Sequence, residues 1–402
     1  KQESPLVGTG MEEIVARQSE WGIFAEDDGE VLYTDANKIS VKYNKEGVKD
    51  YNLVSFYRSN ENTCFTQKPV VKSGDKFKKG DVLADGPTIV DGEFSIGTNL
   101  RAALMFYEGY NYEDSVIISD RIVRDDLLTS IHIREHTVDI RDTELGPEMI
   151  TADIPHVNDR ILQKLDSQGI VRSGVYVKSG DILVGVVAPR GEKELTAEER
   201  LLRAIFGESA SDVRDNSLRI PHGEEGIVIR SLILSADKGD KLAPGVLHQV
   251  KVWVANTKKI GFGDKIAGRH GDKNTIAAIR PIEDMPFTED GEPVDIVLTP
   301  TFLKRMNMGQ AEEVHYGRFA ELLNEKLGFP IFEGENTEWI SEELKKRGFS
   351  DEQKVDLYDG RTGEKFPNKV TVGVKYVLKL HHIADEKMHA RSTGPYTAVS
   401  QQ

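Results

Sequence analysis

The 402-residue sequence lacks several features that mark common classes of protein. Cys64 is its one cysteine, which excludes an internal disulfide and a zinc site built on cysteines. No run of eighteen apolar residues is present, so we expect no membrane-spanning helix. Residues 1–30 are too polar for a secretory signal peptide. The single cysteine favours a reducing compartment.

Basic residues are also in the minority. The chain has 52 Lys and Arg against 67 Asp and Glu, a formal net charge of −15. That sum disfavours a nucleic-acid-binding protein, because such proteins usually carry a basic face. The charge is unevenly distributed, however, since residues 251–280 hold seven basic and two acidic side chains, a local charge of +5. This segment is either a binding surface for an anion or a solvated loop that happens to be basic.

Two sequence motifs that are typical of phosphate-handling sites are also absent. The P-loop pattern GxxxxGK[ST] does not occur. No Asp-x-Asp-x-Asp cluster occurs either, although a two-metal active site needs several converging carboxylates. His381, His382 and His389 do not have the spacing of a common zinc site. We therefore expect no metal to be held directly by this chain.

What the sequence does contain is a strand-rich pattern with a few helices, and its 38% of apolar residues is enough for a sizeable core. Alternating apolar residues predict two strands within 30–43 around a turn at 35–37, and further strands at 226–234, 246–255 and 370–380. Helical spacing predicts helices at 98–105, 157–165, from Thr196 onward, 310–327 and 337–346. The polar tip 235–245 predicts a long hairpin between the second and third of these strand regions.

A Gly-Asp pair precedes a strand-like run three times. In each pair the glycine permits a tight turn and the aspartate side chain is expected to close it by a hydrogen bond. The pairs are Gly80-Asp81, Gly180-Asp181 and Gly263-Asp264. Repeated turns of this kind are typical of small barrels and sandwiched hairpins.

Residues 263–273 are the strongest candidate for chemistry. They hold three glycines and four basic or imidazole side chains within eleven residues. Glycines let a backbone approach a ligand closely, and Lys and Arg donate to phosphate oxygens. Lys265 and Lys273 lie eight positions apart across the glycine-rich turn, so both are expected to reach one phosphate path. The alternative is an exposed basic turn.

Other polar segments are weaker candidates. Glu113 and Asp114 stand at a strand entrance, where they either orient a hydrated Mg²⁺ or form a solvated turn. Arg305 precedes a predicted helix and either clamps a phosphate at its N-terminus or covers the helix end. His389 and Arg391 lie in a polar segment before a turn, and Arg58 lies in a polar loop.

Together these segments resemble one family, the β subunit of bacterial-type DNA-directed RNA polymerase, in the order in which that family carries them. The match covers nearly the whole chain. The matching segments are residues 5–12, 58–64, 80–86, 109–115, 201–207, 215–221, 263–273, 305–310, 358–364 and 387–402. We expect an interior fragment, because the chain begins at Lys1 and ends straight after the last motif, and because the family's rifampicin-contact cluster and C-terminal clamp are missing.

The resemblance implies a role for each matching residue. Lys265 and Lys273 resemble two barrel lysines that reach the RNA 3′ end and neighbouring phosphates. Glu113 and Asp114 resemble a pair that meets the second, nucleotide-borne Mg²⁺ indirectly. The carboxylates that hold the catalytic Mg²⁺ belong, in the family, to the partner β′ subunit. The residues implied to lie near the incoming triphosphate or the RNA–DNA hybrid are Arg58, Arg305, His389, Arg391 and Gln67.

The resemblance also implies the architecture and the partners. The expected fold class is β-rich α+β, with a double-psi β-barrel, barrel-sandwich-like elements, a protruding flap hairpin and peripheral helices. Residues 1–402 would form a composite hybrid-binding region, with the flap at 222–256, a barrel segment with the basic motif at 257–310 and a peripheral helical segment at 311–369. The implied activity is nucleotidyl transfer in transcription by a cytoplasmic, nucleoid-associated complex, with the isolated fragment inactive. The implied partners are the β′ subunit, the α dimer, a σ factor at the flap, template DNA and nucleoside triphosphates.

Two segments depart from the family's usual pattern. Where the family has Gly-Asn-Lys-Gly, this chain has Gly271-Asp272-Lys273-Asn274. Asp272 thereby places a negative charge beside Lys273 in sequence, and we expect it to neutralise that lysine in part. Residues 299–304 also differ from the usual sequence before Arg305.

Two other classes of function compete with this interpretation. The Gly-Asp turns are compatible with a non-enzymatic carrier or scaffold of the biotinyl type, although a modified lysine between two methionines is absent. A general polyanion-binding module is the other alternative. Salt-dependent binding to an RNA–DNA hybrid separates a carrier from the other two classes, and nucleotide addition after reconstitution separates the polymerase subunit from a general polyanion binder.

Overall fold

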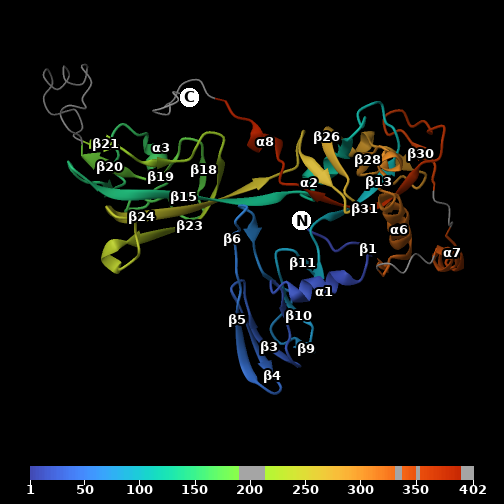
Figure 1. The fold of residues 1–402 in the computed structure, drawn as a ribbon, viewed down its shortest axis with the longest axis horizontal. Helices are drawn as coiled ribbons and strands as arrows, with labels where there is room; N and C mark the ends of the chain where they lie inside the picture. Colours follow the sequence, from blue (N-terminus) through green and yellow to red (C-terminus); the bar gives the residue numbers. More distant parts are fainter. Residues whose placement is uncertain (190–212, 331–336, 350–353, 391–402) are drawn as a thin grey trace. The chain divides into compact units, whose positions relative to one another are not determined.

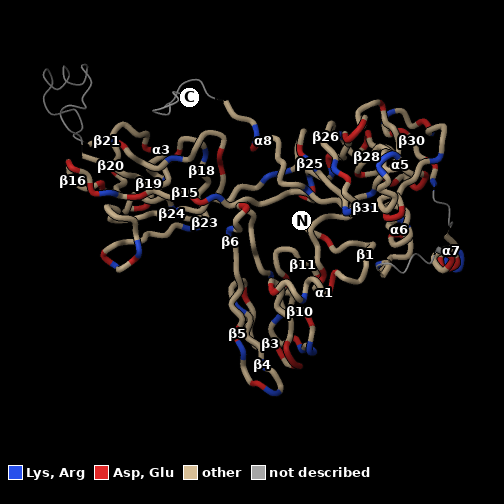
Figure 2. Tube along the Cα trace, viewed as in Figure 1, with Lys and Arg blue, Asp and Glu red and all other residues tan. Residues whose placement is uncertain are grey.

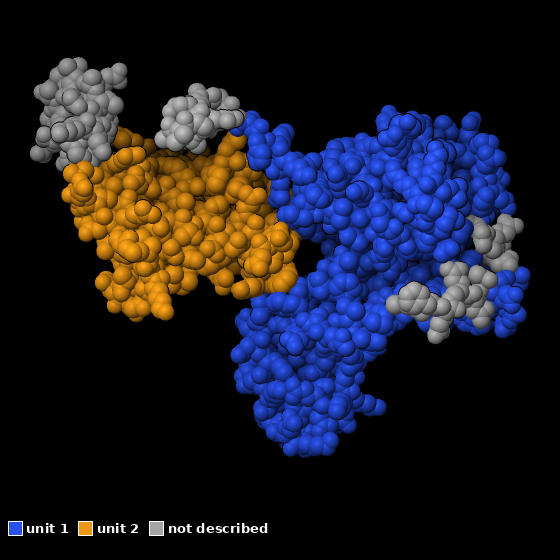
Figure 3. Space-filling view, viewed as in Figure 1, with its two compact units in different colours: residues 1–55, 66–130, 259–402 blue, residues 56–65, 131–258 orange. Residues whose placement is uncertain are grey.

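The computed structural model describes residues 1–189, 213–330, 337–349 and 354–390. The chain divides into two compact units (Figure 3). Unit 1 comprises residues 1–55, 66–130 and 259–402, and unit 2 comprises residues 56–65 and 131–258. Among the described residues, no helix is long and apolar enough to cross a membrane.

A closed barrel of six strands forms the centre of unit 1 (Figure 1). Around the barrel the strands are β13 (Thr98–Leu104), β28 (Ile296–Leu298), β14 (Ser115–Ser119), β26 (Lys273–Arg280), β25 (Lys265–Ala267) and β31 (Thr371–Lys379). The β13–β28 and β14–β26 pairs are parallel and the other four pairs are antiparallel. Closure leaves the barrel without an unpaired edge. Its interior is filled by aliphatic side chains, among them Leu100, Val116, Ile118, Ile266, Ile276 and Ile296.

Helices and smaller sheets surround this barrel in unit 1. The helices are α1 (Met11–Gln18), α2 (Asp120–Arg124), α5 (Phe302–Arg305), α6 (Gly309–Leu323), α7 (Thr337–Lys346) and α8 (Ala384–Lys387). A four-stranded sheet has the order β5 (Gly47–Asn52), β4 (Lys38–Tyr43), β3 (Gly29–Thr34) and β9 (Lys76–Phe77). A three-stranded sheet has the order β2 (Ile23–Phe24), β10 (Val82–Asp85) and β8 (Lys68–Pro69). The short pairs are β1 (Val7–Gly8) with β29 (Leu327–Gly328), β11 (Ile89–Val90) with β12 (Glu93–Phe94), and β27 (Phe287–Thr288) with β30 (Leu357–Tyr358).

The helix α6 packs against β31 at very short range (Figure 1). A Cβ atom at Gly317 would collide with the carbonyl oxygen of Val374, and one at Gly373 would collide with that of Val314. Glycine on both elements therefore permits the two backbones to approach. Because α6 covers this strand, residues 372–377 are all buried. The strand predicted at 370–380 is confirmed, but its burial does not alternate.

Unit 2 is built on a five-stranded sheet. Its order is β16 (Gly146–Pro147), β15 (Ser130–Thr143), β24 (Val246–Lys258), β23 (Glu225–Ser235) and β18 (Tyr176–Lys178). Smaller sheets contain β17 (Met149–Ile150), β20 (Val186–Pro189) and β21 (Val213–Asp215); β19 (Ile182–Val184) and β22 (Leu218–Arg219); and β6 (Tyr57–Arg58) and β7 (Cys64–Phe65). The described helix of this unit, α3 (Asp159–Leu162), is four residues long. A core of valine, leucine and isoleucine side chains joins the five-stranded sheet to the sheets that contain β17, β20, β19 and β22.

The long hairpin predicted in unit 2 is confirmed. β23 and β24 pair antiparallel from Ile227 with Ala255 to Ser235 with His248. The tip between them contains a short 3-10 helix at Ala236–Lys238. At the start of β24, next to the tip, Val246 is buried, whereas Leu247 is 36% exposed.

The Gly-Asp turns form as expected. Each glycine has a positive φ, and each aspartate accepts a hydrogen bond through Oδ2 from the backbone nitrogen three residues before it. The aspartates and their donors are Asp81 with Lys78, Asp181 with Lys178, and Asp264 with Gly261, all at 2.8 Å. A fourth turn of this type, at Gly74-Asp75, was not predicted.

Two of the five predicted helices are confirmed. The helix expected at 337–346 is α7, and the one expected at 310–327 is α6, which ends early because Asn324 adopts a left-handed conformation with φ 54°. The helix expected at 157–165 is reduced to α3, and the one expected from Thr196 lies outside the described residues. The helix at 98–105 was wrong, since these residues form β13.

The error at β13 has a physical cause. Leucine and alanine favour helices locally, yet all seven residues of β13 pair with β31, and three of them also pair with β28. Leu100 and Ala102 are buried, whereas Asn99 and Arg101 are only partly buried. Pairing with two distant strands therefore overrides the local preference.

Candidate functional site

The two lysines of the basic motif lie on adjacent antiparallel strands of the barrel. Lys265 pairs with Thr275, and Ala267 pairs with Lys273. Residues opposite one another in an antiparallel pair point to the same face, and residues two apart on a strand share that face. Lys265 and Lys273 therefore share one face of the hairpin. Ile266, which alternates with them, is 1% exposed and points into the barrel.

Both lysines thus belong to the outer face of the barrel. Lys265 is partly buried and Lys273 is exposed. Figure 2 shows basic positions along β25 and β26. The lysines lie on strands whose register is fixed by the barrel, on either side of the glycine-rich turn.

The turn that carries Glu113 and Asp114 lies directly beside these lysines. The carbonyl oxygen of Asp114 accepts a hydrogen bond from the backbone nitrogen of Thr275 at 2.7 Å, and Thr275 is the residue opposite Lys265. Glu113 is exposed and has φ 54°. The buried side chain of Asn111 holds this turn in place. Its amide oxygen accepts a hydrogen bond from the backbone nitrogen of Tyr107 at 3.0 Å, and its amide nitrogen donates to the carbonyl oxygen of Met105 at 2.6 Å.

Arg305 extends this group. It is the last residue of α5, and its Nη1 atom lies 2.5 Å from Oδ1 of Asp114. Both side chains are almost half exposed, at 47% and 44%. The hydrogen bond and the charge of Asp114 raise the pKa of Arg305 above its already high ordinary value. The predicted residues that meet in this part of unit 1 are Lys265, Lys273, Glu113, Asp114 and Arg305.

Among the described residues of unit 1, no contact links Gln67 or His389 to this group. Gln67 is 9% exposed, and its amide donates to the carbonyl of Trp21 at 2.8 Å and accepts from the nitrogen of Val54 at 3.0 Å. Both ends of the amide are therefore used within the fold. His389 is exposed, and Arg391 lies outside the described residues.

Arg58 belongs to unit 2. Its Nε donates to Asn62 at 2.7 Å, and its Nη1 lies 3.5 Å from a carboxylate oxygen of Glu135. Its side chain is 34% exposed.

The expectation that Asp272 neutralises Lys273 was wrong. The carboxylate of Asp272 accepts a hydrogen bond from Nζ of Lys375 at 2.7 Å, and its side chain is only 9% exposed. Burial favours the neutral acid, but the charge and hydrogen bond of Lys375 hold the pKa of Asp272 below its ordinary value. The charge at position 272 is therefore matched inside the fold, by a residue about a hundred positions away in sequence.

The other two basic side chains of the motif serve the fold. Arg269 and His270 both contact Glu313 of α6, and His270 Nε2 lies 2.8 Å from its carboxylate. Glu313 also accepts from the backbone nitrogen of Tyr376 at 3.1 Å, and its side chain is 3% exposed. Burial raises the pKa of Glu313, but the hydrogen bond from His270 and the charge of Arg269 outweigh it and leave that pKa lowered.

Sequence reasoning missed Glu313 and Lys375. One signal was available for each. Glu313 lies on the face of α6 that also carries Gly317 and Ala320, where a carboxylate breaks the apolar pattern. Lys375 interrupts the apolar run of β31. A charged side chain at a core-facing position needs a partner, but the sequence does not say which one.

A direct metal site is not supported by the described part of the chain. It contains no group of three His, Cys, Asp or Glu side chains arranged to hold an ion. Asp114 is already paired with Arg305. The described acidic residues, Asp114 included, therefore do not form a complete magnesium site.

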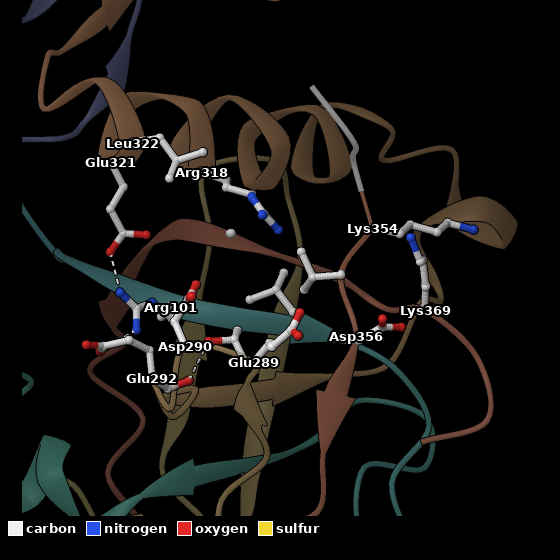
Figure 4. A pocket seen from close by; sticks show the side chains of 14 residues that line it. Arg101, Glu289, Asp290, Glu292, Arg318, Glu321, Leu322, Lys354, Asp356 and Lys369 are labelled. Carbon is white, nitrogen blue, oxygen red and sulfur yellow. Dashed lines mark hydrogen bonds and ion pairs between the residues drawn. The ribbon is translucent and has the colours of Figure 1, made fainter. Parts of the chain in front are cut away.

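A separate pocket of about 440 Å³ lies elsewhere in unit 1 (Figure 4). None of the predicted site residues lines it. Its charged lining is balanced, with four basic and five acidic side chains: Arg101, Arg318, Lys354 and Lys369, and Glu289, Asp290, Glu292, Glu321 and Asp356. Arg101 is already held by Glu292 at 2.8 Å and Glu321 at 2.6 Å. This mixed lining does not suit a polyanion.

Two lysines on one outer face of a β-barrel, with an exposed arginine paired to the adjacent turn, are a set of donors that suits phosphate oxygens. The family model RNA polymerase Rpb2, domain 6 matches residues 24–402. The chain therefore belongs to this family.

The relatives are bacterial proteins named DNA-directed RNA polymerase subunit beta. Identity is 54% over 404 residues with the protein of Acetivibrio thermocellus and 52% over 402 residues with that of Alkaliphilus oremlandii, in each case covering 100% of this chain and 32% of the relative. Identity with the protein of Borreliella afzelii is 51% over 403 residues, covering 99% of this chain and 35% of the relative. The chain spans about a third of the length of these relatives.

Proposed function

We propose that this chain is the part of an RNA polymerase β subunit that contacts the RNA 3′ end, the RNA–DNA hybrid and the incoming nucleoside triphosphate. The proposal is supported by the shared outer face of Lys265 and Lys273 and by Arg305, which pairs with Asp114 in the adjoining turn. Two ammonium groups on one face are suited to successive phosphates of a nucleic acid. The partners would be the β′ and α subunits and template DNA.

The proposed contribution of these residues is positioning and charge stabilisation. Phosphoryl transfer gains most of its rate from these two effects rather than from covalent chemistry by the protein. Lys265 and Lys273 would hold the RNA 3′ end and the adjacent phosphates, and Arg305 would hold the triphosphate. Arg58, His389 and Arg391 are proposed to lie near the same substrate. Magnesium would be held by carboxylates of the β′ subunit.

Glu113 and Asp114 are proposed to face the second, nucleotide-borne Mg²⁺ through water. Their turn stands at the entrance of β14, beside the strand that carries Lys273. Gln67 is proposed to support the hybrid-facing surface from within the fold, since its amide is engaged with Trp21 and Val54.

The test is single-nucleotide extension on a preassembled RNA–DNA scaffold by the complete polymerase. Loss of one preorganised donor typically slows a reaction on the order of 10²–10³-fold. We expect Lys265→Ala and Lys273→Ala each to slow extension strongly while the subunits still assemble. Extension by Lys265→Ala at a rate near that of the unmodified enzyme, in an assembled complex, would contradict the proposal.

A second proposed function concerns the hairpin β23–β24 as a flap that docks a protein partner, by resemblance the C-terminal part of a σ factor. It is supported by Leu247, which is apolar and 36% exposed at a polar tip. Exposed apolar residues at a protruding tip favour docking.

The proposed divisions of the chain are a flap at 222–256, a barrel segment at 257–310 and a peripheral segment at 311–369, with a double-psi topology for the barrel.

A further inference from the structure

A buried ion pair lies beneath the turn that joins β25 to β26. Nζ of Lys375, in β31, donates to Oδ2 of Asp272 at 2.7 Å and to Oε1 of Gln310 at 2.9 Å. The side chain of Lys375 is 2% exposed and that of Asp272 is 9% exposed. The pair therefore belongs to the interior of unit 1, whereas Lys273, the next residue after Asp272, is exposed on the outer face.

The turn closes tightly around this pair. A Cβ atom at Gly268 would lie 2.6 Å from Oδ1 of Asp272 and 2.8 Å from Cε of Lys375. Glycine at this position therefore lets the backbone fold over the lysine stem. The same turn is held a second time, because Arg269 and His270 both contact the buried Glu313.

Two acid–base groups, each with a buried carboxylate, thus fix one turn of five residues, 268–272, to α6 and β31. The turn sets the register of β25 and β26, and that register decides whether Lys273 faces outward. An error of one residue in register would turn Lys273 toward the barrel interior. The Lys375–Asp272 pair constrains Lys273 more directly than the contacts of Glu313 do, because Asp272 is the residue that precedes Lys273 in the chain.

We propose that Lys375 and Asp272 form a positioning unit for Lys273, one that places its amine on the ligand-facing side of the barrel. This inference rests on the proposed function of Lys265 and Lys273. Lys375 is buried and touches no ligand, so it acts through Asp272 and is not a catalytic residue. Asp272 departs from the asparagine usual in the family pattern, and Lys375 supplies the matching charge within this chain.

Single and double substitutions of Lys375 and Asp272 can test whether the two residues act as a buried ion pair. Removing one member leaves a buried charge without its partner, which is strongly unfavourable, whereas replacing both members by neutral side chains of similar size is often tolerated. Methionine is close to lysine in length and asparagine is close to aspartate in shape. We therefore expect Lys375→Met and Asp272→Asn to be harmful singly and much less harmful together.

The experiment uses the complete β subunit assembled into polymerase, with single-nucleotide extension measured over a range of triphosphate concentrations. Displacement of a reacting group by about 1 Å can cost on the order of 100-fold in rate. We expect Lys375→Met and Asp272→Asn each to lower the extension rate by roughly tenfold to 100-fold on that basis. The double variant should recover most of the loss. Lys38→Met removes an exposed lysine that pairs with Asp50 at 2.6 Å, and as the control it should change the rate less than about twofold.

The Lys273→Ala background distinguishes a positioning role of Lys375 from a purely structural one. If Lys375 acts through Lys273, adding Lys375→Met to Lys273→Ala should slow extension less than about twofold further. A full additional loss in that background would mean that Lys375 acts independently of Lys273, and it would overturn the proposal. Assembly is followed by size-exclusion chromatography of every variant.

The remaining outcomes are also decisive. Normal extension by Lys375→Met, together with slow extension by Lys265→Ala, would refute the positioning unit and leave the proposed function intact. Normal extension by Lys265→Ala would instead refute the proposed function. If Lys375→Met does not assemble, Asp272→Asn and the double variant carry the test, and equal rates for these two would overturn the pairing.

Discussion

Arg305 and Asp114 form an exposed ion pair at the edge of the proposed site, with Nη1 and Oδ1 2.5 Å apart. To reach a phosphate, Arg305 must exchange Asp114 for it. Exposed ion pairs shift an equilibrium only about 1.5- to 5-fold. A charge-assisted contact to phosphate is worth about tenfold to a hundredfold. The phosphate should therefore win the competition, with Asp114 acting as a weak competitor.

Two substitutions test this reasoning in opposite directions. Arg305→Ala should weaken use of the nucleoside triphosphate about tenfold to a hundredfold. The loss should be smaller for a substrate that lacks the terminal phosphates. Asp114→Asn keeps the size of the side chain but removes its charge, so release of Arg305 should lower the KM for the triphosphate about 1.5- to 5-fold. That gain should shrink at high salt, because salt screens exposed charges. Loss of the proposed contact to the second Mg²⁺ should lower the maximal rate of extension.

The assay is single-nucleotide extension by assembled polymerase at several triphosphate concentrations and two ionic strengths. In a polymerase that already carries Arg305→Ala, Asp114→Asn should leave the KM for the triphosphate unchanged, since the residue it releases is gone, and should lower only the maximal rate. An unchanged KM for Asp114→Asn in the otherwise unmodified polymerase would refute the competitor model. Equal losses by Arg305→Ala for di- and triphosphate would point to a structural role.

Three further outcomes are expected. Leu247→Glu should abolish σ-dependent initiation at promoters that require the flap contact, while Leu232→Glu, at another exposed leucine of the hairpin, should not; unchanged initiation by Leu247→Glu would remove the proposed contact. The isolated 402-residue chain should extend no primed template, and any extension without other subunits would contradict the assignment of the metal-binding carboxylates to a partner. The pKa of Glu313 in the fold is below its ordinary value of 4.5, so its contribution to the stability of unit 1 is complete above pH 4.5 and is lost as pH falls through the lower folded pKa. Hydrogen-exchange protection of α6 and β31 should decline on acidification in that window, and Glu313→Gln should reduce this decline; an identical acid response in both proteins would exclude Glu313 as the cause.

The sequence alone determined the features that depend on neighbours in the chain. The Gly-Asp turns are an example, because each aspartate bonds to a nitrogen three residues away and the glycine needs a positive φ. The hairpin β23–β24 is another, since alternating strands and a polar tip specify it locally. The amphipathic pattern of α7 likewise predicted its bounds. Resemblance to the family located the two lysines, Arg305 and Asp114 as candidates.

Only the tertiary structure decided the features that depend on distant pairing. Residues 98–104 favour a helix by composition, but they form a strand because β31 and β28 supply backbone partners on both sides. The shared face of Lys265 and Lys273 follows from the register of their strands, which spacing in sequence does not fix. Asp272 lies beside Lys273 in sequence, yet its charge is matched by Lys375, 103 positions away. A buried charge must find a partner wherever the fold provides one, and that partner is chosen by packing of the barrel rather than by proximity along the chain.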